Sequence, residues 1–149
     1  MPRSEQIPGE QFQPGDRVRC LILDVRDSTS QVKVVLSRAH PDFIRKLFEA
    51  EVPEVAERVI EIKALAREPG QRCKVAVASV DSKVDAKGAC IGVRGSRIRN
   101  IVDEVNGEKI DIVLWNESSQ VLISNAVRPA AVDEVSLCFE LGRATIIVR

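Results

Sequence analysis

The chain has 149 residues, of which 44% are hydrophobic and 30% charged, a composition typical of a folded protein of about one domain. No apolar run approaches the roughly 20 residues of a membrane helix, and the first residues lack a signal-peptide core, so we expect a cytoplasmic protein. The 22 Lys and Arg balance 22 Asp and Glu, and aromatic residues make up only 3%. The balanced charge argues against a protein that coats nucleic acid through its overall charge, and the low aromatic content argues against a binding surface built from several stacked aromatic rings. Neither value excludes a local basic site.

The first predicted element is a hairpin between Gly15 and Arg38. Residues 17–25 and 31–37 are rich in β-formers, and the polar stretch 27–30 between them suits a hairpin loop. A two-stranded hairpin is only marginally stable alone in water. We therefore expect it to pack on another part of the molecule, or to be the end of a larger β domain whose start is missing.

Six elements are predicted between Pro41 and Trp115, in the order α-β-β-α-α-β. A helix starts near Pro41 and ends where the residues Val52-Pro53 break its pattern. The later elements are strands at 59–67 and 72–79, a short helix at 85–91, a longer helix at 95–105 and a strand at 109–115. Apolar residues at helical spacing mark the two longer helices: Phe43, Ile44, Leu47 and Phe48 in the first, and Ile98, Ile101, Val102 and Val105 in the second.

The same pattern starts again near residue 118. A helix at 120–127 is capped by Ser118 or Ser119, and two strands follow at 134–140 and 144–148. This α-β-β order repeats the beginning of the preceding segment. We infer an internal repeat of one supersecondary unit, whose second copy is cut off before its later helices.

The segment Gly92-Val93-Arg94-Gly95 joins the two helices of the complete unit. Glycines at both ends allow a tight turn and let a sugar–phosphate backbone approach without a Cβ clash. The second helix begins at Gly95 or Ser96, so its free N–H groups and the positive end of its dipole point at the loop. The segment is therefore predicted to bind an anion.

Basic residues gather around this loop in a chain whose net charge is zero. Five basic residues and one acid lie between Lys83 and Arg99, a local charge of about +4. Arg94 and Arg97 are expected to neutralise phosphates, while Val93 and Ile91 would contribute to an apolar groove for the bases between the short helix and the edge strand. The candidate binding residues are Gly92, Val93, Arg94, Gly95 and Arg97, with Lys87 and Arg99 as weaker candidates.

A glycine pair at this spacing is a weak signal alone, because a helix–helix turn with solvated arginines has the same pattern. Its context is more specific: two strands precede the helix pair, a strand follows it, and Ile91 stands directly before the first glycine. Together these features are typical of a KH module, in which a GxxG loop clamps a short run of nucleotides. The predicted ligand is therefore single-stranded RNA.

The chain resembles the NusA family of bacterial transcription termination/antitermination factors over nearly its whole length. The most specific stretches run from Gly88 to Arg97 and from Asn106 to Trp115. The resemblance implies a polymerase-binding domain, an OB-type RNA-binding barrel and two type II KH domains, in that order. It assigns residues 1–38 to the last strands of the barrel, 41–117 to the complete first KH domain and 118–149 to the start of the second.

The expected fold class is therefore α+β, with a type II KH domain preceded by the end of an OB-fold barrel and followed by a truncated second KH domain. A second GxxG loop would fall beyond Arg149, so we expect a fragment, a partial gene or a reduced paralogue. The resemblance also implies a monomer that acts with RNA polymerase and other elongation factors on nascent RNA, away from membranes.

An enzyme is disfavoured by the residues present. His40 is alone in a linker and is expected to be solvated, and the acidic residues show no metal-binding spacing. We predict no catalytic residue, no metal and no cofactor. The cysteines form no CxxC pair and are expected to be small buried thiols, with one packed under the glycine loop: Cys20, Cys73, Cys90 and Cys138.

The alternative function is a non-catalytic protein-interaction scaffold in the transcription or translation machinery. Its support is an acidic run that is either a solvated face or a protein contact, formed by Glu49, Glu51, Glu54 and Glu57. Trp115, at the end of the last strand of the complete unit, is expected to pack at a domain junction.

Overall fold

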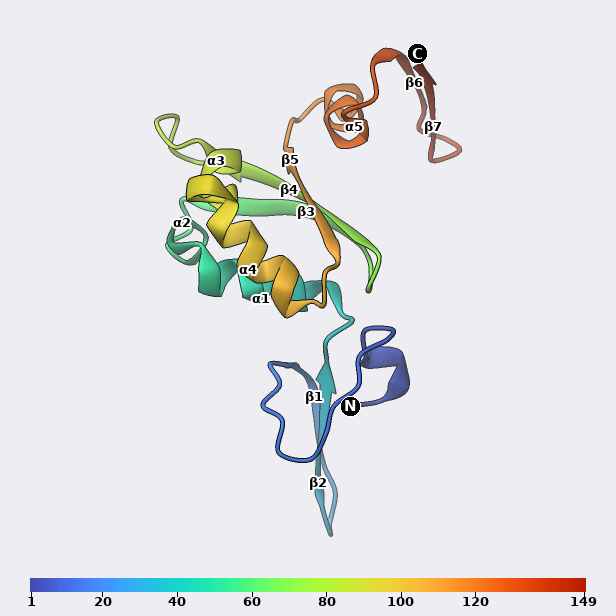
Figure 1. Ribbon diagram of the computed structural model, residues 1–149. Coiled ribbons are helices and arrows are strands. Elements are labelled where there is room, and N and C mark those ends of the chain that lie inside the picture. The colour runs from blue at the N-terminus through green and yellow to red at the C-terminus, as the bar shows by residue number, and fades with distance from the viewer.

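A three-stranded sheet forms the centre of the molecule in the computed structural model, which describes residues 1–149 (Figure 1). The helices and strands are β1 (Leu21–Asp27), β2 (Val32–Ser37), α1 (Pro41–Glu51), α2 (Pro53–Ala56), β3 (Ile60–Glu68), β4 (Arg72–Ser79), α3 (Ala86–Ile91), α4 (Ser96–Glu104), β5 (Lys109–Leu114), α5 (Ser119–Val127), β6 (Val132–Cys138) and β7 (Arg143–Val148). The central sheet has the order β3-β4-β5, with β3 antiparallel to β4 and β4 parallel to β5. Separate two-stranded sheets, β1-β2 and β6-β7, precede and follow it in the chain, so the fold is mixed α+β.

The hydrophobic core lies between this sheet and the helices α1 and α4. The apolar stripe predicted for α1 is buried in full. In α4, Ile101 is buried, Val105 is buried just beyond the end of the helix, and Ile98 packs against the core. Burial of side chains of this size stabilises the fold by roughly 1.5–3 kcal/mol each. The prediction of two amphipathic helices is therefore confirmed.

The break after α1 and both ends of β1 and β6 differ from the sequence prediction by more than one residue, and β6 spans Val132–Cys138 rather than 134–140. The break expected at Val52-Pro53 is followed at once by helix α2, because Pro53 takes a first-turn position where a proline loses no hydrogen bond. Strand β1 begins at Leu21 rather than at Arg17. The carbonyl of Arg19 accepts a hydrogen bond from Nη1 of Arg38, at 2.7 Å, and strand pairing starts only at Leu21, opposite Ser37.

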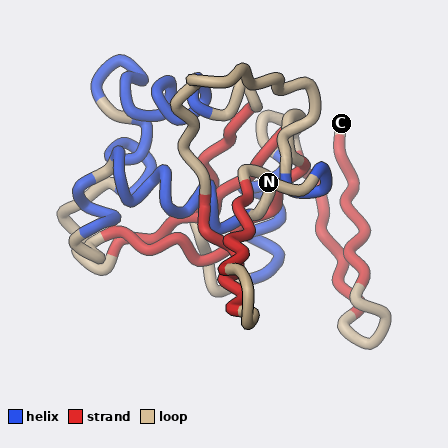
Figure 2. Tube along the Cα trace, turned by 90° about the horizontal axis from the view of Figure 1, so that it is seen from below, coloured by secondary structure: helices blue, strands red, loops and turns tan.

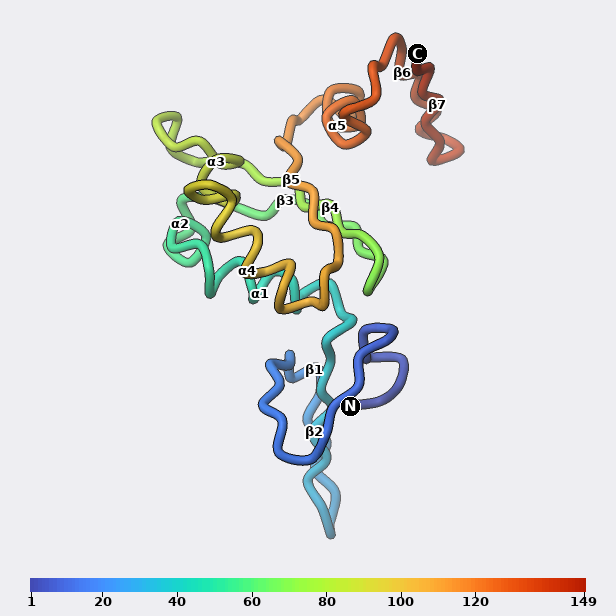
Figure 3. The backbone as a smooth tube through the Cα atoms, viewed as in Figure 1, coloured from blue at the N-terminus to red at the C-terminus, as the bar shows by residue number.

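The N-terminal part packs on the central domain at the base of its hairpin, and the far end extends away from it (Figure 3). Ile7 is only 1% exposed and belongs to the same core as α1. At the tip of the hairpin, by contrast, Val25 and Val32 are exposed. The hairpin thus packs on another part of the molecule as expected, while its assignment to the end of a barrel stays a prediction.

Two buried arginines join the N-terminal part to the central domain. The Arg38 guanidinium binds both carboxylate oxygens of Glu10, at 2.7 and 2.8 Å, and Oε1 of Glu104 at 2.9 Å. Arg67 forms a fully buried ion pair with Glu108, and its Nη1 donates to the Arg38 carbonyl at 2.7 Å. This junction is therefore held by charged hydrogen bonds, which are stronger than neutral ones.

The C-terminal part meets the central sheet through α5, and its hairpin β6–β7 stands apart (Figure 2). Lys74 Nζ donates to the Ala126 carbonyl at 2.6 Å, and Asn125 Nδ2 donates to the Leu114 carbonyl at 3.1 Å. These bonds fix α5 beside the edge strand β5. No helix in the chain has both the length and the apolar composition needed to cross a bilayer.

Candidate nucleic-acid interface

The glycine loop between α3 and α4 has a backbone that suits glycine at both ends. The φ angles of Gly92, Arg94 and Gly95 are 76°, 53° and 75°, a region that residues with a Cβ adopt at a cost of roughly 1–2 kcal/mol each. Gly95 is also the N-cap of α4, and it has no side chain to accept from the first-turn N–H groups. The N–H groups of Gly95 and Ser96 already bond the carbonyls of Gly92 and Val93, so the start of α4 presents mainly the positive end of its dipole beside the loop.

The predicted basic residues do not all reach solvent in the same way. Lys87, Arg94 and Arg99 are exposed, and Arg99 Nη2 donates to the Arg94 carbonyl at 3.2 Å. Arg97 is half-buried, and its Nη1 lies 2.9 Å from Oε2 of Glu54. Three cations around the loop are thus available to a ligand, while the fourth already has a carboxylate partner.

A groove of about 340 Å³ lies beside the loop, between α3, α4 and the edge strand β5, with α5 at one end. Its lining includes the apolar residues Ile91, Ile98, Ile110 and Ile112 and the basic residues Lys74, Lys87 and Arg128. An apolar groove is therefore present between the short helix and the edge strand, with Ile91 in its wall. Val93 does not line this groove, because it lies at the tip of the loop with 82% of its surface exposed.

The residues that form the loop, its two helices and the central sheet also match a known family. A family model described as the NusA-like first KH domain matches residues 38–115. This chain belongs to the NusA family.

Similar proteins from three bacteria carry the name transcription termination/antitermination protein NusA. The chain is 45% identical to the protein of Thermus thermophilus, 44% to that of Mycobacterium tuberculosis and 40% to that of Halalkalibacterium halodurans. Each match covers 99% of this chain but only 38%, 43% and 39% of the respective relative. The chain thus spans less than half the length of these NusA proteins.

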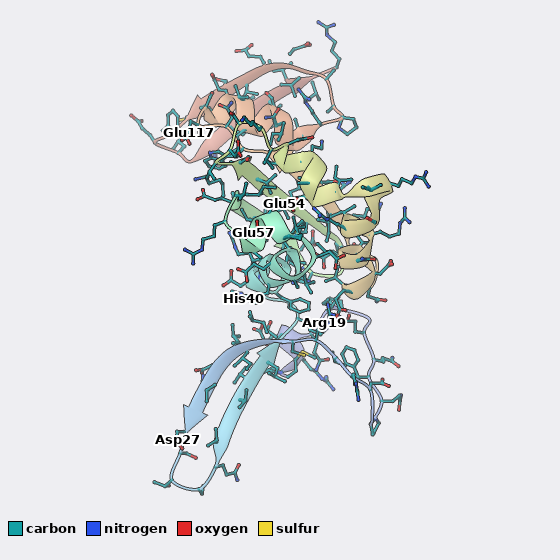
Figure 4. The ribbon with its side chains drawn as sticks, turned by 90° about the vertical axis from the view of Figure 1, so that its left-hand side faces the viewer. Arg19, Asp27, His40, Glu54, Glu57 and Glu117 are labelled. Carbon is teal, nitrogen blue, oxygen red and sulfur yellow. The ribbon has the colours of Figure 1, made fainter.

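The acidic run of this NusA chain makes contacts inside the central domain. Glu54 pairs with Arg97, and Oε1 of Glu51 accepts a hydrogen bond from Asn100 Nδ2 at 2.6 Å, so both acids bind α4. Figure 4 shows Glu54 on the short helix α2 and Glu57 directly after it, and only Glu57 is exposed without an ion pair. The run is therefore mostly engaged within the chain, which removes the main support for the scaffold alternative.

Residues at the two junctions have structural roles. The sequence predicts a solvated linker histidine, and the His40 side chain is indeed 38% exposed, but its Nδ1 also accepts a hydrogen bond from the Asp42 N–H at 3.1 Å and caps α1. Figure 4 shows His40 and Arg19 where the hairpin meets the central domain. At the other junction, Trp115 is half-buried, and its Nε1 donates to Glu117 at 3.2 Å.

The cysteines differ in their exposure. Cys73 and Cys90 are buried, Cys20 is half-buried and Cys138 is exposed. The expectation of buried thiols is therefore wrong for Cys138, the last residue of strand β6. Burial raises the pKa of Cys90 to about 11 and that of Cys73 to about 12. Cys90 is therefore a neutral thiol of the hydrophobic core rather than an activated nucleophile.

Proposed function

We propose that this chain binds single-stranded RNA, without catalysis, at the loop Gly92–Gly95 and in the groove beside it. The observation that carries the proposal is the loop itself. Its exposed Arg94 and Val93 stand between two glycines, next to the uncapped start of α4. This arrangement brings an exposed cation and the positive end of the α4 dipole to one point, which suits a phosphodiester.

The loop and the groove would bind different parts of the nucleotide chain. The glycines let the sugar–phosphate backbone approach closely, and Arg94 neutralises a phosphate, with Lys87 and Arg99 nearby. The apolar wall that includes Ile91 and Ile98 would contact the faces of unpaired bases, which are free only in single strands. A double helix would hide those faces, so the groove favours single-stranded RNA over a duplex.

The same proposal extends to the domain plan. Residues 41–117 would form a complete type II KH domain, since the order α1-β3-β4-α3-α4-β5, with the short helix α2 added after α1, follows the expected α-β-β-α-α-β. Residues 1–38 would be the last strands of an OB-type barrel, and residues 118–149, with α5, β6 and β7, the start of a second KH domain.

The names of the relatives indicate the process in which such binding would act. The similar proteins are named transcription termination/antitermination proteins. We extend this role to the present chain: as a cytoplasmic monomer, it would hold nascent RNA and act with RNA polymerase and other elongation factors.

The binding proposal is tested by titrating the chain with short single-stranded RNA and with DNA of the same sequence. We expect RNA to bind more tightly, with a linear dependence of log K on log salt. The double variant Val93→Asp, Arg94→Asp should weaken binding and reduce the salt slope by about 0.7 for each lost phosphate contact. Lys46→Asp, which reverses an exposed charge on α1 outside the loop and the groove, is the control and should bind as the unchanged chain does.

An unchanged affinity and slope in the double variant, with the fold intact by circular dichroism, would contradict the role of the loop. Absence of RNA binding even at low salt would contradict the whole proposal and favour the scaffold alternative.

A further inference from the structure

Arg97 follows the glycine loop by two residues but points back into the domain. Its side chain is 30% exposed, and its Nη1 lies 2.9 Å from Oε2 of Glu54 on α2. The same nitrogen donates to the Ala89 carbonyl on α3, at 2.8 Å. One guanidinium therefore ties α4, which carries Arg97, to the two helices on the other side of the loop.

Arg97 also packs directly against the first glycine of the loop. A Cβ at Gly92 would lie 2.7 Å from Cγ of Arg97, closer than real Cβ contacts allow, and 3.0 Å from its backbone nitrogen, which is tighter than most of them. The Arg97 stem thus occupies the space that only a glycine leaves free. The position of Gly92 and the position of Arg97 are therefore interdependent.

We infer that Arg97 is a positioning residue held by Glu54, which sets the geometry of the RNA-binding loop without itself binding phosphate. This inference rests on the proposed RNA binding and assigns Arg97 a role different from the phosphate contact predicted from sequence. Its charge also lies near the C-terminal end of α3, where a cation interacts favourably with the helix carbonyls.

The alternative, in which Arg97 swings out to a phosphate, loses several interactions at once. Glu54 is 31% exposed, so its carboxylate would stay partly desolvated without its cation. The Ala89 carbonyl would lose its donor, and the space beside Gly92 would empty. Arg94 already offers a solvent-exposed cation at the loop without any of these losses.

The two roles predict opposite effects of Glu54→Gln on RNA affinity. If Arg97 bound phosphate, removal of a competing carboxylate near the RNA would strengthen binding. If Arg97 positions the loop, the loss of its anchor should weaken binding by about tenfold, the order expected for a hydrogen bond to a charged group. Glu57→Gln removes an equal charge from the same helix segment without touching Arg97, and this matched control should leave the affinity nearly unchanged.

Salt dependence separates positioning from direct contact. We expect Arg94→Gln to lower both affinity and the log–log salt slope, the latter by about 0.7, because it removes a phosphate contact. Arg97→Gln should lower affinity about as much as Glu54→Gln but leave the slope unchanged. The double variant Glu54→Gln, Arg97→Gln should bind RNA no more weakly than either single variant, because both substitutions remove the same ion pair.

A spectroscopic measurement keeps the inference testable where Arg97→Gln folds poorly. Amide hydrogen exchange of Gly92 and Gly95, whose N–H groups bond Gly88 and Gly92 carbonyls at 2.9 and 3.0 Å, should accelerate in Glu54→Gln and not in Glu57→Gln. Tighter RNA binding in Glu54→Gln, or a reduced slope in Arg97→Gln, would overturn the positioning role. Unchanged affinity and slope in Arg94→Gln would instead overturn the RNA-binding proposal, so the two failures are distinguishable.

Discussion

Gly92 and Gly95 frame the loop for different physical reasons, although the sequence pattern treats them alike. Gly92 has φ 76° and ψ 173°, a region open almost only to glycine, and it also lies against Arg97. Gly95 has φ 75° and ψ 19°, which is left-handed helical, and the nearest atom to its virtual Cβ is 4.0 Å away. The spacing of the glycines was predictable, but the packing that constrains only the first was not.

This difference predicts unequal costs for the same substitution. Gly95→Asn should lower the free energy of unfolding by less than about 1 kcal/mol, because asparagine tolerates the left-handed region. Gly92→Asn should cost about 3 kcal/mol or more, since backbone strain adds to overlap with Arg97. Urea denaturation of both variants measures the two values. Equal costs would show that the contact with Arg97 does not constrain Gly92.

At the scale of elements, composition, periodicity and turn residues together predict every strand and all but one of the α-helices. Long elements such as α1 and β4 have buried faces with a clear period, and their type was read correctly. The misses are short or local. Helix α2 has only four residues, too few to show a period, and the capping role of His40 depends on a ring nitrogen facing a backbone N–H, which is set by the conformation of the linker.

The cap of α1 supplies a prediction at this scale. His40→Ala should lower the free energy of unfolding by about 1 kcal/mol, because the Asp42 N–H loses its acceptor at the start of the helix that carries much of the core. His40→Asn should retain most of the stability, since an asparagine side chain can accept the same bond. Thermal or urea denaturation compares the three proteins. A destabilisation of His40→Asn equal to that of His40→Ala would show that the ring contributes through packing instead.

At the scale of the whole molecule, the sequence predicts the order of the N-terminal, central and C-terminal parts along the chain. It does not predict the contacts that join these parts. Arg38 and Glu104 are 66 residues apart, and Arg67 and Glu108 are 41 apart. No local pattern connects residues at such distances. Arg38 is a single basic residue after a strand in the sequence, yet its side chain is 3% exposed in the structure.

The joint formed by Arg38 is expected to decide whether the N-terminal part stays docked. In Arg38→Met, Glu10 would remain 7% exposed without a cation, and the Arg19 carbonyl would lose its donor. An unpaired buried carboxylate costs about 3 kcal/mol or more, so the free energy needed to release residues 1–19 from the central domain falls by about that amount. Hydrogen exchange at the Ala39 amide, which donates to the Glu5 carbonyl at 3.1 Å, should therefore accelerate while β4 stays protected.

Arg26→Met, which breaks an exposed ion pair with Asp24 on the hairpin, is the control for Arg38→Met and should change hydrogen exchange at neither site. Equal acceleration at Ala39 and in β4 would mean that Arg38 stabilises the central domain as a whole and that the N-terminal part cannot separate from it.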